Sequence, residues 1–202
     1  MFCHPEKTIF IHIPKNAGSS IESQLVLKEN NNVKFTMWKS LSNQQQDWFL
    51  GKHRKKMKYA PHAKAYELKQ HYSSMWEEYT TTSIVRDPYD RFCSVYHWSR
   101  FIARELKKIT NPEELFEKLI KRKELMIDTQ ASYLYEGDNL LVDKIFRYEN
   151  IDEAFNYFNI DNVVKKKSNR ITTNEFYDKY PSMKDVIKDY YSIDFERFDY
   201  AK

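Results

Sequence analysis

A lysine-containing turn near the start of the chain combines the groups that bind a phosphate. The turn, Pro-Lys-Asn-Ala-Gly-Ser-Ser at residues 14–20, follows a β-branched apolar run at residues 8–13 that predicts a buried strand. Ser19, with Glu22 three residues later, predicts a capping box at the start of a helix. A strand that enters a helix through such a turn directs backbone N–H groups toward one point. Lys15 adds a positive charge there, and the two serines add hydroxyl donors.

Gly18 is one of only three glycines in the 202 residues, so its place in this turn calls for a reason. We expect that the missing side chain lets the backbone approach an anion closely. In the loop that binds nucleoside triphosphates the lysine follows the glycine, whereas here Lys15 precedes Gly18. An ordinary capped helix explains the same residues, and the turn by itself leaves both interpretations open.

A second candidate anion site follows the predicted strand at residues 80–85. Arg86 leaves this strand, and Ser94 lies eight residues further along a predicted helix. Open α/β sheets place ligands at the carboxyl ends of their strands, and the arginine fork matches the oxygens of a phosphate. We therefore predict that Arg86 and Ser94 are ligands. Asp87 and Arg91 have plainer predicted roles, as a helix N-cap and in a surface ion pair.

Predicted strands alternate with helices along the chain, which favours an α/β fold with a parallel sheet covered on both faces. A third strand is expected within residues 142–148, and helices after Asn111 and at residues 151–158 and 181–191. The helix after Asp87 carries an apolar stripe that includes Ile102, and we expect this stripe to pack on the sheet. Residues 29–74 predict long loops with one or two short helices. The length fits one domain, residues 1–202.

The composition limits the classes of function. The 33 basic and 29 acidic residues give a net charge of +4, which favours anionic ligands without requiring nucleic acid. The chain has two cysteines, no apolar leader after its first residues and no apolar run long enough for a membrane span. We therefore expect a cytoplasmic protein with no membrane-spanning segment.

The two motifs together resemble those of a known family. Residues 10–20, Phe-Ile-His-Ile-Pro-Lys-Asn-Ala-Gly-Ser-Ser, are similar to the 5′-phosphosulfate loop of carbohydrate sulfotransferases that use 3′-phosphoadenosine 5′-phosphosulfate (PAPS). Residues 85–96, Val-Arg-Asp-Pro-Tyr-Asp-Arg-Phe-Cys-Ser-Val-Tyr, resemble the family's 3′-phosphate motif. Weaker similarity at residues 60–63, 145–150 and 194–200 extends over nearly the whole chain. The family's Asn-x-Ser segment is only approximated at residues 167–170.

The resemblance implies a P-loop-like three-layer sandwich and an enzyme that moves a sulfuryl group from PAPS to a hydroxyl, leaving adenosine 3′,5′-bisphosphate. The acceptor implied is a carbohydrate or glycoconjugate. Donor binding would then fall to Lys15, Asn16, Ala17, Gly18, Ser19, Ser20, Arg86 and Ser94. Sulfuryl transfer parallels phosphoryl transfer, so Lys15 would stabilise the charge that develops on the departing phosphate bridge. This scheme requires no metal.

The general base has three candidates. His62 is preferred, because an imidazole titrates near neutral pH and related enzymes carry a histidine just before the 3′-phosphate strand. A solvated histidine in a basic loop is the plainer interpretation. His12 lies inside the predicted strand, which favours a structural role. Glu29 is the third candidate, because some sulfotransferases use a glutamate base.

Two other classes of function compete with this interpretation. A small ATP-dependent kinase needs a magnesium site and the triphosphate loop, which the sequence lacks. A module that binds nucleic acid or another polyanion is suggested by the basic stretch from Lys52 to Lys64, but it leaves both phosphate motifs unexplained. The same stretch could hold an anionic polysaccharide acceptor or form a solvated face. The sequence specifies neither the acceptor nor the oligomeric state.

Overall fold

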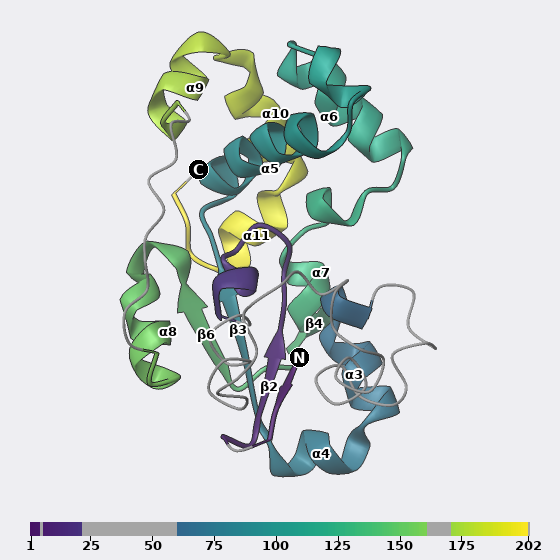
Figure 1. Cartoon of the computed structure of the whole chain (residues 1–202), viewed down its shortest axis with the longest axis vertical. Coiled ribbons are helices and arrows are strands. Elements are labelled where there is room, and N and C mark those ends of the chain that lie inside the picture. The colour runs from purple at the N-terminus through teal and green to yellow at the C-terminus, as the bar shows by residue number, and fades with distance from the viewer. Residues whose placement is uncertain (5, 22–59, 161–170, 202) are drawn as a thin grey trace. The chain divides into compact units, whose positions relative to one another are not determined.

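The computed structural model describes residues 1–4, 6–21, 60–160 and 171–201 (Figure 1). The chain divides into two compact units. The first, here called the sheet unit, comprises Met1–Val85 and Ser132–Val163. The second, the helical unit, comprises Arg86–Ala131 and Val164–Lys202. A single domain for the whole chain stays a prediction.

The sheet unit is built on a four-stranded sheet with the order β1-β2-β3-β6. Strand β1 (Phe2–Cys3) runs antiparallel to β2 (Thr8–Ile11). Strand β3 (Thr80–Val85) is parallel both to β2 and to β6 (Lys144–Arg147). The predicted strand at residues 80–85 is confirmed at both ends, whereas β2 ends two residues before its predicted end. A central, mostly parallel sheet flanked by helices confirms the predicted α/β class.

The two faces of this sheet bury different side chains, because successive strand residues point to opposite faces. On one face Phe10, Ile84 and Phe146 form a buried cluster with Phe155 of α8 (Ile151–Tyr157). On the other face Phe2 contacts the Tyr72 ring edge-on, with centroids 4.7 Å apart. Tyr72 stands between α3 (Ala65–His71) and α4 (Ser73–Glu78). In Figure 1 α8 and α3 lie on opposite sides of the sheet.

Short elements complete the sheet unit. The segment before α3 is the 3-10 helix η3 (Ala60–His62). Helix α7 (Ala131–Leu134) leads into a hairpin of β4 (Tyr135–Glu136) and β5 (Asn139–Leu140), and η6 (Tyr148–Asn150) joins β6 to α8. Gly137 occupies the hairpin turn with a φ of 60°, a conformation that glycine adopts without strain.

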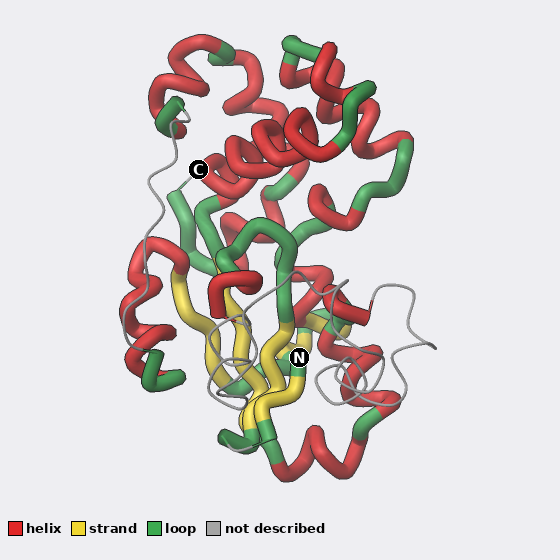
Figure 2. Tube along the Cα trace, viewed as in Figure 1, coloured by secondary structure: helices red, strands yellow, loops and turns green. Residues whose placement is uncertain are grey.

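The helical unit is drawn in Figure 2 as helices joined by loops, with no strand among its described residues. Its longest helix is α5 (Pro88–Ile102), whose N-cap Asp87 accepts a hydrogen bond from the Asp90 backbone N–H at 3.1 Å. Asn111 caps α6 (Pro112–Lys121) through the Glu113 N–H at 2.8 Å. Both predicted helix starts are confirmed. The remaining helices are η4 (Leu106–Lys108), η5 (Leu125–Ile127), α9 (Thr173–Lys179), α10 (Ser182–Tyr190) and α11 (Ser192–Arg197).

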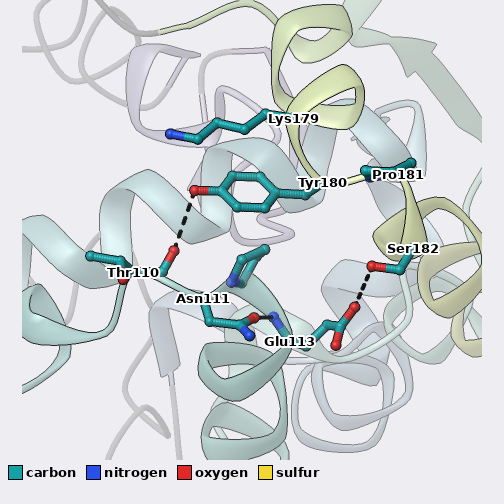
Figure 3. Close-up of a pocket in the computed structure, with 8 residues that line it drawn as sticks. Thr110, Asn111, Glu113, Lys179, Tyr180, Pro181 and Ser182 are labelled. Atoms are coloured by element: carbon teal, nitrogen blue, oxygen red, sulfur yellow. Dashed lines mark hydrogen bonds between the residues drawn. The ribbon is translucent and has the colours of Figure 1, made fainter.

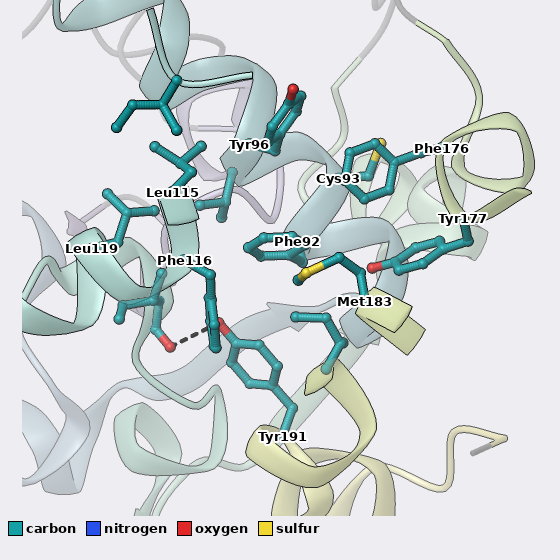
Figure 4. Close-up of a cluster of buried hydrophobic side chains, with 14 of the residues drawn as sticks. Phe92, Cys93, Tyr96, Leu115, Phe116, Leu119, Phe176, Tyr177, Met183 and Tyr191 are labelled. Atoms are coloured by element: carbon teal, nitrogen blue, oxygen red, sulfur yellow. Dashed lines mark hydrogen bonds between the residues drawn. The ribbon is translucent and has the colours of Figure 1, made fainter. Parts of the chain in front are cut away.

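The apolar stripe of α5 packs on other helices, so the prediction that it covers the sheet is wrong. Phe92 contacts the ring of Phe116 in α6, with centroids 5.3 Å apart, and that of Phe176 in α9 at 6.2 Å. Figure 4 shows these rings together with Met183 of α10. The period of a stripe identifies a buried face but not the element that covers it. Ile102, predicted to belong to this face, is 59% exposed.

No helix in the described part of the chain is long enough and apolar enough to cross a membrane.

Candidate functional site

The loop after β2 has the alternating signs of φ that are found in anion-binding nests. Lys15 and Ala17 have positive φ angles of 71° and 61°, whereas Asn16 between them does not. Alternation between left-handed and right-handed residues turns successive N–H groups toward one concave side, where an anion can accept from several of them. Non-glycine residues with positive φ are sterically disfavoured and cluster at functional sites. Two of the six described non-glycine residues with positive φ thus lie where the sequence predicts phosphate binding.

The helix after this loop begins at Gly18, so the predicted N-cap at Ser19 is wrong. Residues 18–21 are helical, and the Ala17 carbonyl accepts from the Ser20 N–H at 2.8 Å and from the Ile21 N–H at 3.3 Å. Ala17 therefore occupies the cap position, because its left-handed backbone turns the chain into the helix. Ser19 and Ser20 lie in the first turn, exposed to solvent.

The loop is fastened to the neighbouring strand by a side chain. Asn16 is 1% exposed, and its Nδ2 donates to the Ile84 carbonyl of β3 at 2.8 Å. Ser83 of the same strand donates through Oγ to the Ile11 carbonyl of β2 at 2.9 Å. Because the amide group of Asn16 is committed to β3, this residue can meet an anion through its backbone N–H.

The ring of His12 explains why residue 18 is a glycine. This reason differs from the predicted one, which is the close approach of an anion. A Cβ at this position would lie 2.0 Å from Cδ2 and 2.3 Å from Nε2 of His12. The imidazole of His12, only 5% exposed, fills the space that a side chain would need. The missing Cβ therefore admits the His12 ring to the Gly18 backbone. The close approach of an anion at Gly18 stays a prediction.

His62 lies against the same histidine. Its Nδ1 is 3.0 Å from the His12 carbonyl oxygen, and the two rings meet at an interplanar angle of 66° with centroids 4.4 Å apart. A carbonyl only accepts, so Nδ1 of His62 must carry the proton and donate. In the neutral ring Nε2 then holds the lone pair, which is the tautomer a general base needs.

Other predicted residues of the sheet unit have different outcomes. Glu29 and residues 52–59 of the basic stretch lie outside the described residues. Lys64, at the end of that stretch, donates from Nζ to the Ser132 Oγ at 3.1 Å and lies 5.3 Å from the centre of the Tyr133 ring. Lys64 is thus engaged within the sheet unit.

In the helical unit, the backbone of Arg86 is held by a buried glutamine. The Arg86 N–H donates to Oε1 of Gln130 at 2.8 Å, and Nε2 of Gln130 donates to the Arg86 carbonyl at 2.8 Å. The backbone N–H groups of Gln130 and Ala131 in turn donate to the Asp194 carboxylate, each at 2.8 Å. Burial raises the pKa of Asp194, against the opposite effects of Arg91 and of these backbone hydrogen bonds.

The guanidinium of Arg86 is paired with Asp90. Arg86 Nε donates to Oδ2 of Asp90 at 2.7 Å, Nη2 lies 2.5 Å from the same oxygen, and Thr173 Oγ1 donates to the other one. The half-buried Ser94 follows Asp90 by four residues on α5. Residues four apart share one side of a helix, so Ser94 lies on the side of α5 that carries Asp90, the partner of Arg86. Whether Arg86 and Ser94 bind an anion stays a prediction.

Arg91 is buried, so its predicted role in a surface ion pair is wrong. It is 1% exposed, and it donates from Nη1 to the Asp128 carbonyl at 2.9 Å and from Nη2 to the Met126 carbonyl at 3.1 Å. Its guanidinium carbon lies 5.6 Å from the centre of the Tyr191 ring. A helix of alternating charged and apolar residues does not reveal that one of its charges points inward to satisfy backbone carbonyls.

A separate pocket of about 320 Å³ in the helical unit contains none of the predicted residues (Figure 3). It lies between the start of α6 and the junction of α9 with α10. Its polar groups pair with one another, since Tyr180 donates to the Thr110 carbonyl at 3.4 Å and Ser182 donates to Glu113. Because these polar groups are already hydrogen-bonded to one another, the pocket does not indicate a particular ligand.

Sequence reasoning missed the roles of Asp90 and Gln130 and the contact between His12 and Gly18. The pairing of Asp90 with Arg86 had a signal, because opposite charges four residues apart meet on a helix. Gln130 had none, since it lies far along the chain from the backbone that it holds. The packing of His12 on Gly18 also leaves no trace in a pattern of residue types.

Within the described residues, no group of three or more histidine, cysteine or acidic side chains is placed to hold a metal ion. The metal-free scheme stays a prediction.

A family model described as the sulfotransferase family matches residues 1–201. Searches of curated proteins and of solved structures gave no match.

Proposed function

Because the chain belongs to the sulfotransferase family, we propose that it transfers a sulfuryl group from PAPS to a hydroxyl of a carbohydrate or glycoconjugate. The observation that carries this proposal is the loop of alternating φ angles at Lys15, Asn16 and Ala17. Its N–H groups suit the 5′-phosphosulfate, and the exposed hydroxyls of Ser19 and Ser20 add donors at the start of the helix.

In the proposed reaction the acceptor oxygen attacks the sulfur in line with the bond to the phosphate. That sulfur–oxygen bond breaks, and its electron pair stays with the departing adenosine 3′,5′-bisphosphate. The ammonium group of Lys15 and the loop N–H groups stabilise the negative charge that builds on the bridging oxygen. Because the loop is strained and fastened by Asn16 before any ligand arrives, its donors need little reorganisation during the reaction.

The proton of the acceptor hydroxyl goes to His62 in this scheme. The hydrogen bond from Nδ1 to the His12 carbonyl supports the choice, because it orients the ring and leaves Nε2 as the acceptor. His12 is a weaker candidate, since it is almost fully buried and packs on Gly18. Glu29 remains an alternative base.

The 3′-phosphate is assigned to Arg86 and Ser94. The reciprocal hydrogen bonds with Gln130 fix the backbone from which the arginine projects. A phosphate would compete with Asp90 for the guanidinium, and Asp90 would keep that guanidinium oriented before the donor binds.

The first test is calorimetric titration with PAPS, adenosine 3′,5′-bisphosphate and ATP. The native chain should bind the first two and not ATP, and Arg86→Ala should weaken binding of the bisphosphate at least tenfold, about 1.4 kcal/mol. Lys15→Ala should weaken PAPS binding. Arg122→Ala and Lys144→Ala, which remove cations elsewhere on the chain, are the matched controls. Preference for ATP, or equal effects of the control variants, would refute the proposal.

The base is tested by transfer assays with a panel of sugar acceptors. His62→Asn should lower kcat by roughly a hundredfold or more and leave the affinity for adenosine 3′,5′-bisphosphate unchanged. The kcat of the native enzyme should fall at low pH, and this fall should be absent from the variant. An unchanged kcat would return the role to Glu29.

A further inference from the structure

The carboxyl end of α5 exposes a cluster of apolar side chains. Phe101 is 80% exposed and Ile102 is 59% exposed, the two highest values among the large apolar residues described. The Trp98 ring stacks on Phe101, with centroids 6.1 Å apart and an interplanar angle of 29°. Phe101 thus exposes most of its surface while its ring contacts that of Trp98. Adjacent exposed apolar residues mark an interaction surface more often than scattered ones.

Cations surround this apolar end. Arg104, Lys107 and Lys108 are exposed, and none of them pairs with a carboxylate of the described residues. The nearest acidic residue in the chain, Glu105, is neutralised by Arg122 of the α6 terminus at 2.7 Å. The segment from Trp98 to Lys108 therefore presents uncompensated positive charge beside an apolar tip.

We propose that this end of α5 docks the protein on an anionic lipid surface. Phe101 and Ile102 would enter the boundary between headgroups and acyl chains, and Arg104, Lys107 and Lys108 would contact the headgroup phosphates and carboxylates. The charge complementarity selects an anionic membrane. An aliphatic side chain such as Ile102 offers little to a sugar, which stacks on aromatic faces, and this favours lipid over a polysaccharide.

Peripheral membrane binding of this kind needs apolar insertion and electrostatic attraction together, because a few apolar side chains alone bind a bilayer only weakly. Each cation near an anionic surface strengthens binding by about fivefold, so the three together account for roughly a hundredfold. Insertion of the two apolar side chains contributes at least about tenfold more. Salt should weaken the binding, because the cations are exposed.

The test is sedimentation of the full chain with phosphatidylcholine vesicles, with and without phosphatidylserine. The native chain should bind only the vesicles that contain phosphatidylserine. Arg104→Gln/Lys107→Gln/Lys108→Gln should reduce binding about a hundredfold, and Phe101→Ser/Ile102→Ser at least about tenfold. These side chains are exposed, so circular dichroism should show an unchanged fold.

Two control variants separate this surface from general charge and hydrophobicity. Lys69→Gln/Lys184→Gln/Lys188→Gln removes three exposed cations from other helices, and Leu140→Ser removes an exposed apolar side chain from the sheet unit. Both should bind vesicles like the native chain. The proposal is overturned if the native chain ignores phosphatidylserine, if the control variants lose as much binding as the test variants, or if heparin binds at this surface and vesicles do not.

Discussion

Replacement of Gly18 by alanine should destabilise the protein through one identifiable collision. The backbone at Gly18 is helical with no positive φ, so alanine is compatible with its conformation and would even favour the helix by up to about 1 kcal/mol. The new Cβ, however, would lie 2.0 Å from Cδ2 of His12, far inside van der Waals contact. The ring is buried, so it cannot swing into solvent. Overpacking of this kind costs about 1–3 kcal/mol.

A double-mutant cycle with His12→Ala isolates that collision. His12→Ala alone should cost about 2–4 kcal/mol, as other buried large-to-small changes do. The double variant should be more stable than the sum of the single changes predicts, by about 1–3 kcal/mol, because the ring that meets the new Cβ is gone. Urea unfolding measures all four free energies. Additive effects, or a Gly18→Ala variant as stable as the native chain, would refute the reasoning.

Gly137 supplies the matched control. No atom lies within 4 Å of the position of a Cβ there, but its φ is 60°. Gly137→Ala should therefore cost about 1 kcal/mol through backbone strain alone. His12→Ala should not relieve this cost.

Three further predictions concern the helical unit. Asp90→Asn keeps one acceptor oxygen for Arg86 but removes the competing charge, so calorimetry should show adenosine 3′,5′-bisphosphate binding a few-fold more tightly. Weaker binding would mean that Asp90 mainly orients the arginine. Arg91→Met leaves two backbone carbonyls without the donor that a buried arginine supplies, and it should lower the free energy of unfolding by about 2–4 kcal/mol in urea titrations, with ligand affinity retained. Burial raises the pKa of Asp194, so the folded chain keeps this proton to a higher pH than the unfolded chain. The stability that results is present at low pH and is lost as the pH rises through the folded pKa. Urea titrations at several pH values should show that Asp194→Asn removes this pH dependence.

Local signals in the sequence predicted much of the fold. The buried strand at residues 80–85 and the capped starts of α5 and α6 were predicted from an apolar run and from Asp-Pro and Asn-Pro pairs, because both signals act within a few residues. The partner of α5 was predicted wrongly, since the helices that cover it include α9 and α10, far along the chain. Helix α9 was not predicted at all, although Thr172 and Glu175 form a capping box.

The residues of the candidate site stay predictions, and their local structure was predicted only in part. The motif at residues 10–20 indicated a turn at Lys15 and Gly18, yet the positive φ of Lys15 and Ala17 could not be expected, because lysine and alanine rarely adopt it. The contacts of His12 with Gly18 and His62 depend on the path of the loop at residues 12–18 and on how η3 packs against it. The spacing of residue types along the sequence does not reveal such contacts.

The division of the chain into two interleaved units affects how the protein can be made. Each unit consists of two segments, with part of the other unit between them. During synthesis β3 leaves the ribosome long before β6, its partner in the sheet, and the first helices of the other unit emerge in between. The core around Phe92 likewise cannot form before Phe176 and Met183 have been synthesised. Each core therefore depends on segments that are made at different times, and no continuous fragment of the chain contains either unit alone.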